Sequence, residues 1–175
     1  MKSRLISKYK AQAWGLDLMV AVFIFSIALT VFFVFSLNQP NEGNENLEYL
    51  FYDGKIIARS ILSEGVPIDW NPLNVVSVGI LSDDKINLTK LERFRDMAIN
   101  LNDYERTKQL FNTKYDYYFF LDKPMKINGD DDVDGIGKPG VTRDTVSSNA
   151  ENLIKITRYT IYEYEPITAY VYVWE

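Results

Sequence analysis

The sequence predicts an α+β fold, in which an N-terminal transmembrane helix is followed by an amphipathic helix packed on an antiparallel β-sheet head. Three observations lead to this prediction: a long apolar run, a later segment with apolar side chains at helical spacing, and a C-terminal third that alternates as strands do. The expected divisions are a basic leader (1–15), a transmembrane helix (16–37), a polar linker (38–46) and a head domain (47–175).

The apolar run contains no charged side chain between residues 18 and 35. As a helix, this stretch would rise about 27 Å, close to the ~30 Å apolar thickness of a bilayer. Backbone groups in lipid must be paired within the segment, so we expect a helix. The residues before the run include four basic and no acidic side chains, which places the N-terminus in the cytoplasm and residues 38–175 outside. The basic residues are Lys2, Arg4, Lys8 and Lys10.

Three simpler interpretations of the run have to be weighed. A buried core helix is the first alternative, although this run is apolar on every face. A cleaved secretory signal is an alternative because Val34 and Ser36 loosely imitate a cleavage site, although the run exceeds the usual 7–15 residues of a signal core. A plain membrane anchor with no further role is the third.

Composition excludes several kinds of chemistry. The 175 residues include no cysteine and no histidine, so serine–histidine and cysteine–histidine catalysis cannot occur within this chain. Imidazole and thiolate metal sites are excluded for the same reason, while oxygen-ligand metals remain open. The net charge is −5, and the basic residues of the leader leave the remainder still more acidic. An acidic exterior argues against nucleic-acid binding, which needs clustered lysine and arginine.

The segment after the apolar run predicts a helix break and then an amphipathic helix. Pro40, within the polar linker, lacks an amide donor and should kink or end the first helix. Residues 47–63 resume helical spacing, and Gly65 with Pro67 should stop that helix. The predicted apolar face consists of Leu47, Leu50, Phe51, Gly54, Ile57, Ala58, Ile61 and Leu62.

The middle of the chain predicts one strand and two short helices. Residues 75–81 have the composition of a short buried strand. Thr89 and Glu92 match a capping box, which predicts a helix through Leu101. Asp103 is the expected cap of a second helix that carries Leu110 and Phe111.

The C-terminal third predicts strands. Residues 115–121 are mostly aromatic, and residues 153–164 are rich in isoleucine, threonine and tyrosine. Residues 167–174 alternate, with Ile167, Ala169, Val171 and Val173 on one side and Thr168, Tyr170, Tyr172 and Trp174 on the other. A turn around residues 165–166 would join the last two strands as a hairpin.

The order of these segments, together with several short motifs, resembles archaeal type IV pilins and pilin-like membrane proteins. Residues 10–12 (Lys-Ala-Gln) are similar to the Lys-(Gly/Ala)-Gln signature before the apolar segment, and residues 12–18 resemble the start of that segment. Further similarities are Gly65-Val66-Pro67, Asp69-Trp70, Val78-Gly79-Ile80, Lys90-Leu91, Gly137-Lys138-Pro139 and Tyr172-Val173-Trp174.

The resemblance implies a processing region and an assembly residue. In that family a prepilin peptidase cuts on the cytoplasmic side of the apolar helix, here within Lys10, Ala11, Gln12 and Ala13. A cut after Ala11 makes Asp17 the sixth residue, and a cut after Gln12 makes it the fifth. In the family a carboxylate at the fifth position pairs with the terminal amine of a neighbouring subunit, a role that would fall to Asp17. Its alternative role is an interfacial carboxylate that favours a helix N-terminus.

An acidic segment near residue 130 predicts a calcium site. Asp130, Asp132 and Asp134 alternate before a glycine, as in the first half of a D-x-D-x-D-G loop, and Ile136 would offer its carbonyl. The closing position of an EF-hand falls on Val141, which has no ligating side chain, so a calcium-stabilised loop between strands is the prediction. Its last ligand would be Asp144, Asn128, another segment or water. A solvated acidic loop is the alternative.

A glycosylation acceptor is predicted at Asn87, which begins an Asn-Leu-Thr sequence. In the alternative interpretation, Thr89 only caps a helix.

Taken together, these features favour a structural subunit or minor component of a type IV pilus-like surface filament, and not an enzyme. Its expected partners are the lipid bilayer, copies of itself or other pilin-like subunits, prepilin peptidase and the pilus assembly machinery. The first alternative is an unprocessed single-pass surface protein whose head binds a partner. The second is a membrane-anchored hydrolase that uses carboxylates, which would require a convergent pair of acidic residues.

Overall fold

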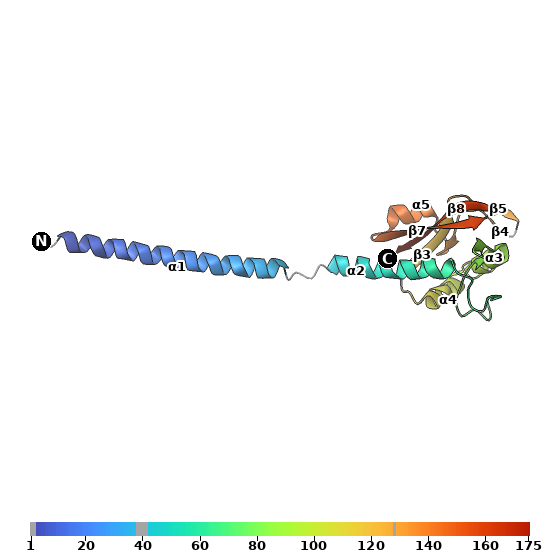
Figure 1. The fold of residues 1–175 in the computed structure, drawn as a ribbon, viewed down its shortest axis with the longest axis horizontal. Coiled ribbons are helices and arrows are strands. Elements are labelled where there is room, and N and C mark those ends of the chain that lie inside the picture. Colours follow the sequence, from blue (N-terminus) through green and yellow to red (C-terminus); the bar gives the residue numbers. More distant parts are fainter. Residues whose placement is uncertain (1–2, 38–41, 128) are drawn as a thin grey trace. The chain divides into compact units, whose positions relative to one another are not determined.

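The computed structural model describes residues 3–37, 42–127 and 129–175 (Figure 1), with the backbone alone described at 3–14, 42–45 and 130–132. The chain divides into two units, Met1–Glu42 and Gly43–Glu175. The predicted polar linker falls at this division, and Pro40 lies outside the described residues. The class is mixed α and β, with an N-terminal apolar helix and a sheet that is mainly antiparallel.

The first unit contains a single long helix, α1 (Ser3–Leu37). Its residues Gly15–Leu37 are long and apolar enough to cross a membrane, and none of them is buried within the structure. Two of the hydroxyl groups on the apolar surface, those of Ser26 and Thr30, are hydrogen-bonded within the helix. Ser26 Oγ donates to the carbonyl of Val22, and Thr30 Oγ1 donates to that of Ser26, each at 2.8 Å. These two bonds lower the cost of placing the hydroxyls of Ser26 and Thr30 in an apolar surrounding.

The second unit begins with α2 (Glu42–Ile61), which packs on a sheet through one face. The fully buried side chains of this face are Leu50, Ile57, Ala58 and Ile61, as their spacing predicts. Leu47 and Phe51, expected on the same face, are exposed instead. Gly54 allows the close approach, because a Cβ atom there would lie 3.2 Å from Ile156 and 3.5 Å from Val173.

The main sheet has six strands in the order β1-β2-β7-β8-β3-β6. All neighbouring pairs are antiparallel except β2 and β7, which are parallel and meet at one residue pair, Lys85↔Ile161. A separate hairpin is formed by β4 (Met125–Ile127) and β5 (Asp130–Val133). The main strands are β1 (Leu81–Ser82), β2 (Lys85–Ile86), β3 (Asp116–Leu121), β6 (Ile136–Gly137), β7 (Leu153–Tyr162) and β8 (Glu165–Trp174).

The hairpin of β7 and β8 confirms the predicted pair of C-terminal strands but corrects the position of the turn. Glu163 and Tyr164 form the turn, both with positive φ (48° and 66°), so the connection has two residues. Pro166 lies within β8 opposite Ile161. This turn was not predictable from local residue types, because neither residue is a glycine or asparagine, the types that usually adopt such a conformation.

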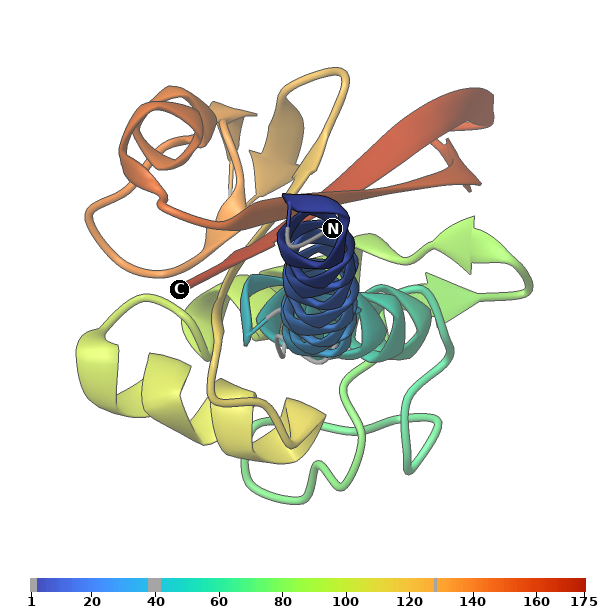
Figure 2. The same ribbon diagram turned by 90° about the vertical axis from the view of Figure 1, so that its left-hand side faces the viewer.

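The sheet is covered on both faces, which the sequence did not predict. On one face, α2, α3 (Leu88–Asp96) and α4 (Leu101–Phe111) close the larger core. On the other, α5 (Arg143–Asn149) covers a smaller aromatic cluster (Figure 2). This cluster explains why Trp174, on the outward side of β8, is only 7 % exposed.

The segment predicted as a strand at 75–81 is a loop until Leu81, which begins β1. Val75, Val78 and Ile80 are nevertheless buried, so their apolar character reflects the core and not a strand. The loop is fixed by Trp70, whose Nε1 donates to the carbonyl of Gly79 at 2.7 Å. Gly79 itself lies so close to the end of α2 that a Cβ atom would be 2.2 Å from the nitrogen of Gly65.

Two helix caps differ from those predicted. Asn87, not Thr89, caps α3, and its side chain accepts from the backbone N–H of Lys90. Asn100, not Asp103, caps α4. The helix expected to run to Leu101 ends at Asp96, and a separate helix, α4, begins at Leu101. Asparagine and aspartate cap helices almost equally well, so sequence alone did not discriminate between neighbouring candidates.

Candidate functional site

Asp17 is the one charged residue in the stretch Gly15–Leu37, and its side chain is exposed. It lies near the start of this stretch but well inside α1, which begins at Ser3, and therefore not at a helix N-terminus. A carboxylate at this depth is costly in an apolar surrounding unless a cation pairs with it. The predicted processing residues Lys10, Ala11, Gln12 and Ala13 have a helical backbone within α1, and their side chains lie outside the described set.

The acidic segment predicted to bind calcium forms strand β5, and its first two ligands cannot be placed. The backbone of Asp130 and Asp132 belongs to this strand, while their side chains lie outside the described set. Ile136, the proposed carbonyl donor, lies in β6 opposite Phe119. Among the side chains that the structure describes, no group of three acidic residues is placed to hold a metal ion.

The third proposed ligand, Asp134, is engaged by protein groups. Its Oδ1 lies 2.5 Å from a guanidinium nitrogen of Arg143, and its Oδ2 accepts from the Tyr118 hydroxyl at 3.2 Å. The backbone N–H of Arg143 also donates to Oδ2, at 3.4 Å. These contacts join the end of β5 to the start of α5, and a cation would have to compete with Arg143 for this carboxylate. Calcium binding stays a prediction.

Asn87, the predicted glycosylation acceptor, is half-buried and uses both side-chain polar atoms. Its Oδ1 accepts from Lys90 N–H, and its Nδ2 donates to Ser82 Oγ, each at 3.2 Å. Nδ2 is the atom that would carry a glycan, and modification would leave it a single N–H for the bond to Ser82. The site is therefore a cap by its geometry, and glycosylation stays a prediction.

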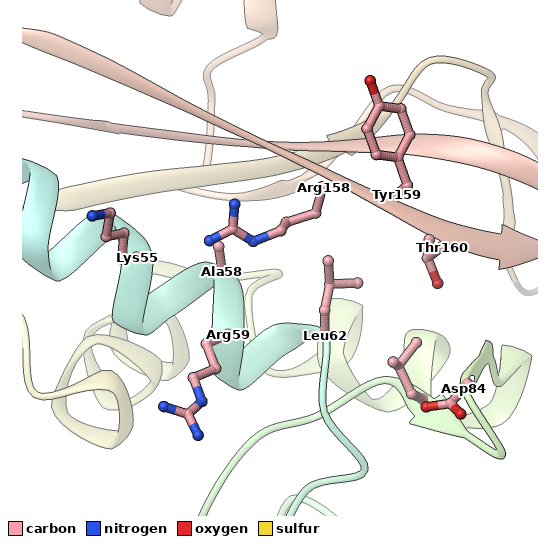
Figure 3. A pocket seen from close by; sticks show the side chains of 9 residues that line it. Lys55, Ala58, Arg59, Leu62, Asp84, Arg158, Tyr159 and Thr160 are labelled. Atoms are coloured by element: carbon pink, nitrogen blue, oxygen red, sulfur yellow. The ribbon is translucent and has the colours of Figure 1, made fainter.

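A groove of about 410 Å³ lies between α2 and β7, and sequence reasoning did not identify it (Figure 3). Three cationic side chains line it: Lys55 and Arg59 from α2 and Arg158 from β7. The turn between β1 and β2 contributes Asp84, which is the only acidic residue of the lining. The sequence carried one relevant feature, because Arg158 interrupts the apolar alternation of the strand that contains it.

A second polar cluster surrounds Asp116, at the start of β3. Its carboxylate accepts from Lys138 Nζ at 2.6 Å, from the Tyr104 hydroxyl at 3.0 Å and from Lys108 Nζ at 3.3 Å. Burial raises the pKa of Asp116, but the hydrogen bond from Lys138 and the charge of Lys108 outweigh this effect, so its pKa lies below the ordinary value. The carboxylate is therefore ionised and fully engaged, as in a structural ion-pair network.

Three tyrosines of this region are held in the neutral form. Burial raises the pKa of Tyr104, Tyr117 and Tyr118 above the ordinary value of 10.0. The hydroxyl groups of Tyr117 and Thr107 are hydrogen-bonded to each other inside the core. These phenols serve as hydrogen-bonding residues: Tyr104 donates to Asp116 and Tyr118 donates to Asp134.

The described residues include one helix long and apolar enough to cross a membrane and a groove lined by three cationic side chains, and comparisons with known proteins leave the family open. No protein-family model, no curated protein and no solved structure matches this chain.

Proposed function

We propose that this chain is a structural subunit or minor component of a type IV pilus-like surface filament, inserted in the bilayer by α1. The observation that carries the proposal is the separation of one wholly exposed apolar helix from a compact α+β unit. Such a helix needs an apolar surrounding, which lipid supplies before assembly and neighbouring helices would supply afterwards. No catalytic role is proposed for any residue.

Asp17 is the residue on which assembly depends in this proposal. Released by cleavage within residues 10–13, a new terminal ammonium on one subunit would pair with Asp17 of the next. Pairing offsets the cost of holding a carboxylate within an apolar helix bundle. The same residue has no comparable role in a plain anchor, because α1 begins at Ser3 and Asp17 lies well beyond the first turn, where a carboxylate would favour the helix N-terminus.

The first test is the true N-terminus of the protein in its native membrane. Intact-mass measurement of the purified chain should give a mass that lacks either residues 1–11 or residues 1–12. A matched variant, Lys10→Ala, reports whether the basic residue before the cut is needed for processing. A mass that includes residues 1–12 would contradict cleavage and, with it, the assembly role.

A second candidate function is an unprocessed surface protein whose head binds a partner. The groove of Lys55, Arg59 and Arg158 favours it, because these cations lie on the head and not on the membrane helix. Electron microscopy of sheared surface filaments, with an antibody against the head, separates the two functions. Labelling along filaments supports the subunit, whereas labelling confined to the cell envelope supports the anchored binding protein.

A further inference from the structure

The inner face of β7 loses its apolar character halfway along the strand. Ile154 and Ile156 pack against the core, and the next two residues on the same face are Arg158 and Thr160. Both of these polar residues line the groove beside the end of α2. Figure 3 shows the Arg158 side chain extending toward α2 and the Tyr159 ring directed away from it. Arg158 and Thr160 therefore face a groove, whereas Tyr162, the next residue on this face, is again part of the core.

The strand edge beside this groove is open. On one side, β7 pairs with β8 over its whole length, without a bulge, from Leu153↔Trp174 to Tyr162↔Glu165. On the other side, β2 meets it only at Ile161. Within the described ranges, residues 153–160 thus have no strand on that side, and no proline interrupts them. An uncovered edge of this length is a template for another strand.

The charge of the groove indicates which kind of added strand would bind beside it. Lys55, Arg59 and Arg158 have no carboxylate within ion-pair distance in the part of the chain that the structure describes. By contrast, five other cations of the head form ion pairs, namely Lys108, Lys123, Lys126, Lys138 and Arg143. Residues 43–175 carry 22 acidic and 15 basic side chains, so the groove is a positive site on an acidic domain. Such a site attracts carboxylates and repels basic segments.

The groove also offers an apolar floor and a free hydroxyl. Ala58, Leu62 and Leu81 supply apolar surface between the cations. Thr160 Oγ1 is buried and has no hydrogen-bond partner among the described residues. An added strand would form hydrogen bonds with the main-chain groups along the edge. Every second side chain of that strand would point to the face where the groove residues lie.

We infer that the open edge of β7 binds an extended, carboxylate-rich segment of another protein, which adds to the sheet as a strand and places its acidic side chains beside Lys55, Arg59 and Arg158. The inference goes beyond filament assembly and does not depend on cleavage of the leader. It gives the head a partner defined by two properties, an extended backbone and negative charge at alternate positions.

The test uses the full chain in detergent micelles and two synthetic heptapeptides as probes, Glu-Val-Glu-Thr-Glu-Val-Glu and its lysine counterpart. The acidic peptide should bind saturably and more weakly as salt increases, and the lysine peptide should not bind. Arg158→Glu should lower the affinity about tenfold or more, and Arg158→Gln by less. Arg106→Glu makes the same charge change on α4, outside the groove, and should leave the affinity within about twofold.

Hydrogen exchange measured by mass spectrometry tests the strand addition itself. Peptide binding should protect amides within residues 153–160, which β8 alone cannot fully protect. Binding without such protection, or binding that Arg158→Glu leaves unchanged, would overturn the inference, as would the absence of binding. If the chain instead associates with itself through the groove, and Arg158→Glu abolishes this, the occupant is a second copy and the proposed partner is wrong.

Discussion

Asp116 joins three segments of the head through one carboxylate, and its removal has a calculable effect. Tyr104 and Lys108 reach it from α4, and Lys138 reaches it from the loop after β6. The side chain is 19 % exposed and that of Lys108 is 13 % exposed, so the pair is partly shielded from water. Asp116→Asn keeps the shape of the side chain and removes its charge.

The expected cost follows from the bonds that are weakened. A hydrogen bond to a charged group contributes roughly 1.5–3 kcal/mol to stability. The variant recovers part of this loss, because both lysines regain contact with water and Lys108 keeps its ion pair with Glu105. We therefore expect Asp116→Asn to lower the free energy of unfolding by about 2 kcal/mol. For a domain of this size that corresponds to a fall of roughly 8 °C in Tm.

Thermal unfolding of the full chain in detergent, followed by near-ultraviolet circular dichroism, measures this fall. Asp96→Asn is the matched control, because Asp96 is exposed on the last turn of α3 and should change the stability by no more than about 0.5 kcal/mol. The reasoning is refuted if the two variants melt at the same temperature.

The same carboxylate predicts a pH dependence of defined sign. Its pKa in the folded protein lies below the ordinary value of 3.8, because the lysines and the Tyr104 hydroxyl outweigh the effect of burial. As pH falls, the unfolded chain takes up the proton first, so the stabilisation is complete above the ordinary pKa and is lost as pH falls through the folded pKa. The difference in Tm between the parent chain and Asp116→Asn should be constant near neutral pH and should shrink in acid. A difference that persists unchanged at about pH 2 would contradict this sign.

Four further outcomes are expected. Asp17→Ala should leave the protein in the membrane fraction but remove it from sheared filaments, as fractionation and immunoblotting would show; its presence in filaments at parental levels would argue against the pairing role. Asn87→Ala should cost about 1 kcal/mol through loss of the α3 cap, whereas Thr89→Ala should cost little; mass spectrometry would show a glycan missing from both variants if the site is modified. Gly79→Ala should destabilise the head by more than about 2 kcal/mol in chemical denaturation, because its Cβ would overlap backbone atoms that cannot retreat; a stability equal to that of the parent would show that the loop yields. Added calcium should raise Tm and a chelator should lower it, and no response to either would remove the predicted metal.

The periodic parts of the fold could be predicted because periodicity reports burial directly. The face of α2 with Ile57, Ala58 and Ile61 and the inward side of β8 are buried where the pattern placed them. Buried residues without a regular period were misassigned, as in the loop that contains Val78. That loop is held by the Trp70 hydrogen bond and by close packing at Gly79. These contacts follow no regular spacing along the chain.

The candidate sites stay predictions, because a residue type fits several roles until its neighbours are known. Asn87 reads as a glycosylation acceptor, but its geometry is that of a helix cap. Asp134 reads as a metal ligand, yet it pairs with Arg143 from a helix that follows it in sequence. Lys90 would be expected on a solvated helix face, but it is buried and donates to the carbonyls of Glu64 and Leu81.

The sequence by itself determined the long apolar helix, the mixed α and β composition of the head and the strands at its C-terminus. These follow from local rules, because the length of an apolar run and the spacing of side chains are set along the chain. Only the tertiary structure decided that Arg158 lines one groove with Lys55 and Arg59, beside an open strand edge. The same holds for the two lysines that form ion pairs with the carboxylate of Asp116. Both groupings include residues far apart in the sequence, such as Lys55 with Arg158 and Asp116 with Lys138. Which of them come together is decided by the packing of α2 and α4 on the sheet, and local sequence patterns do not report that packing.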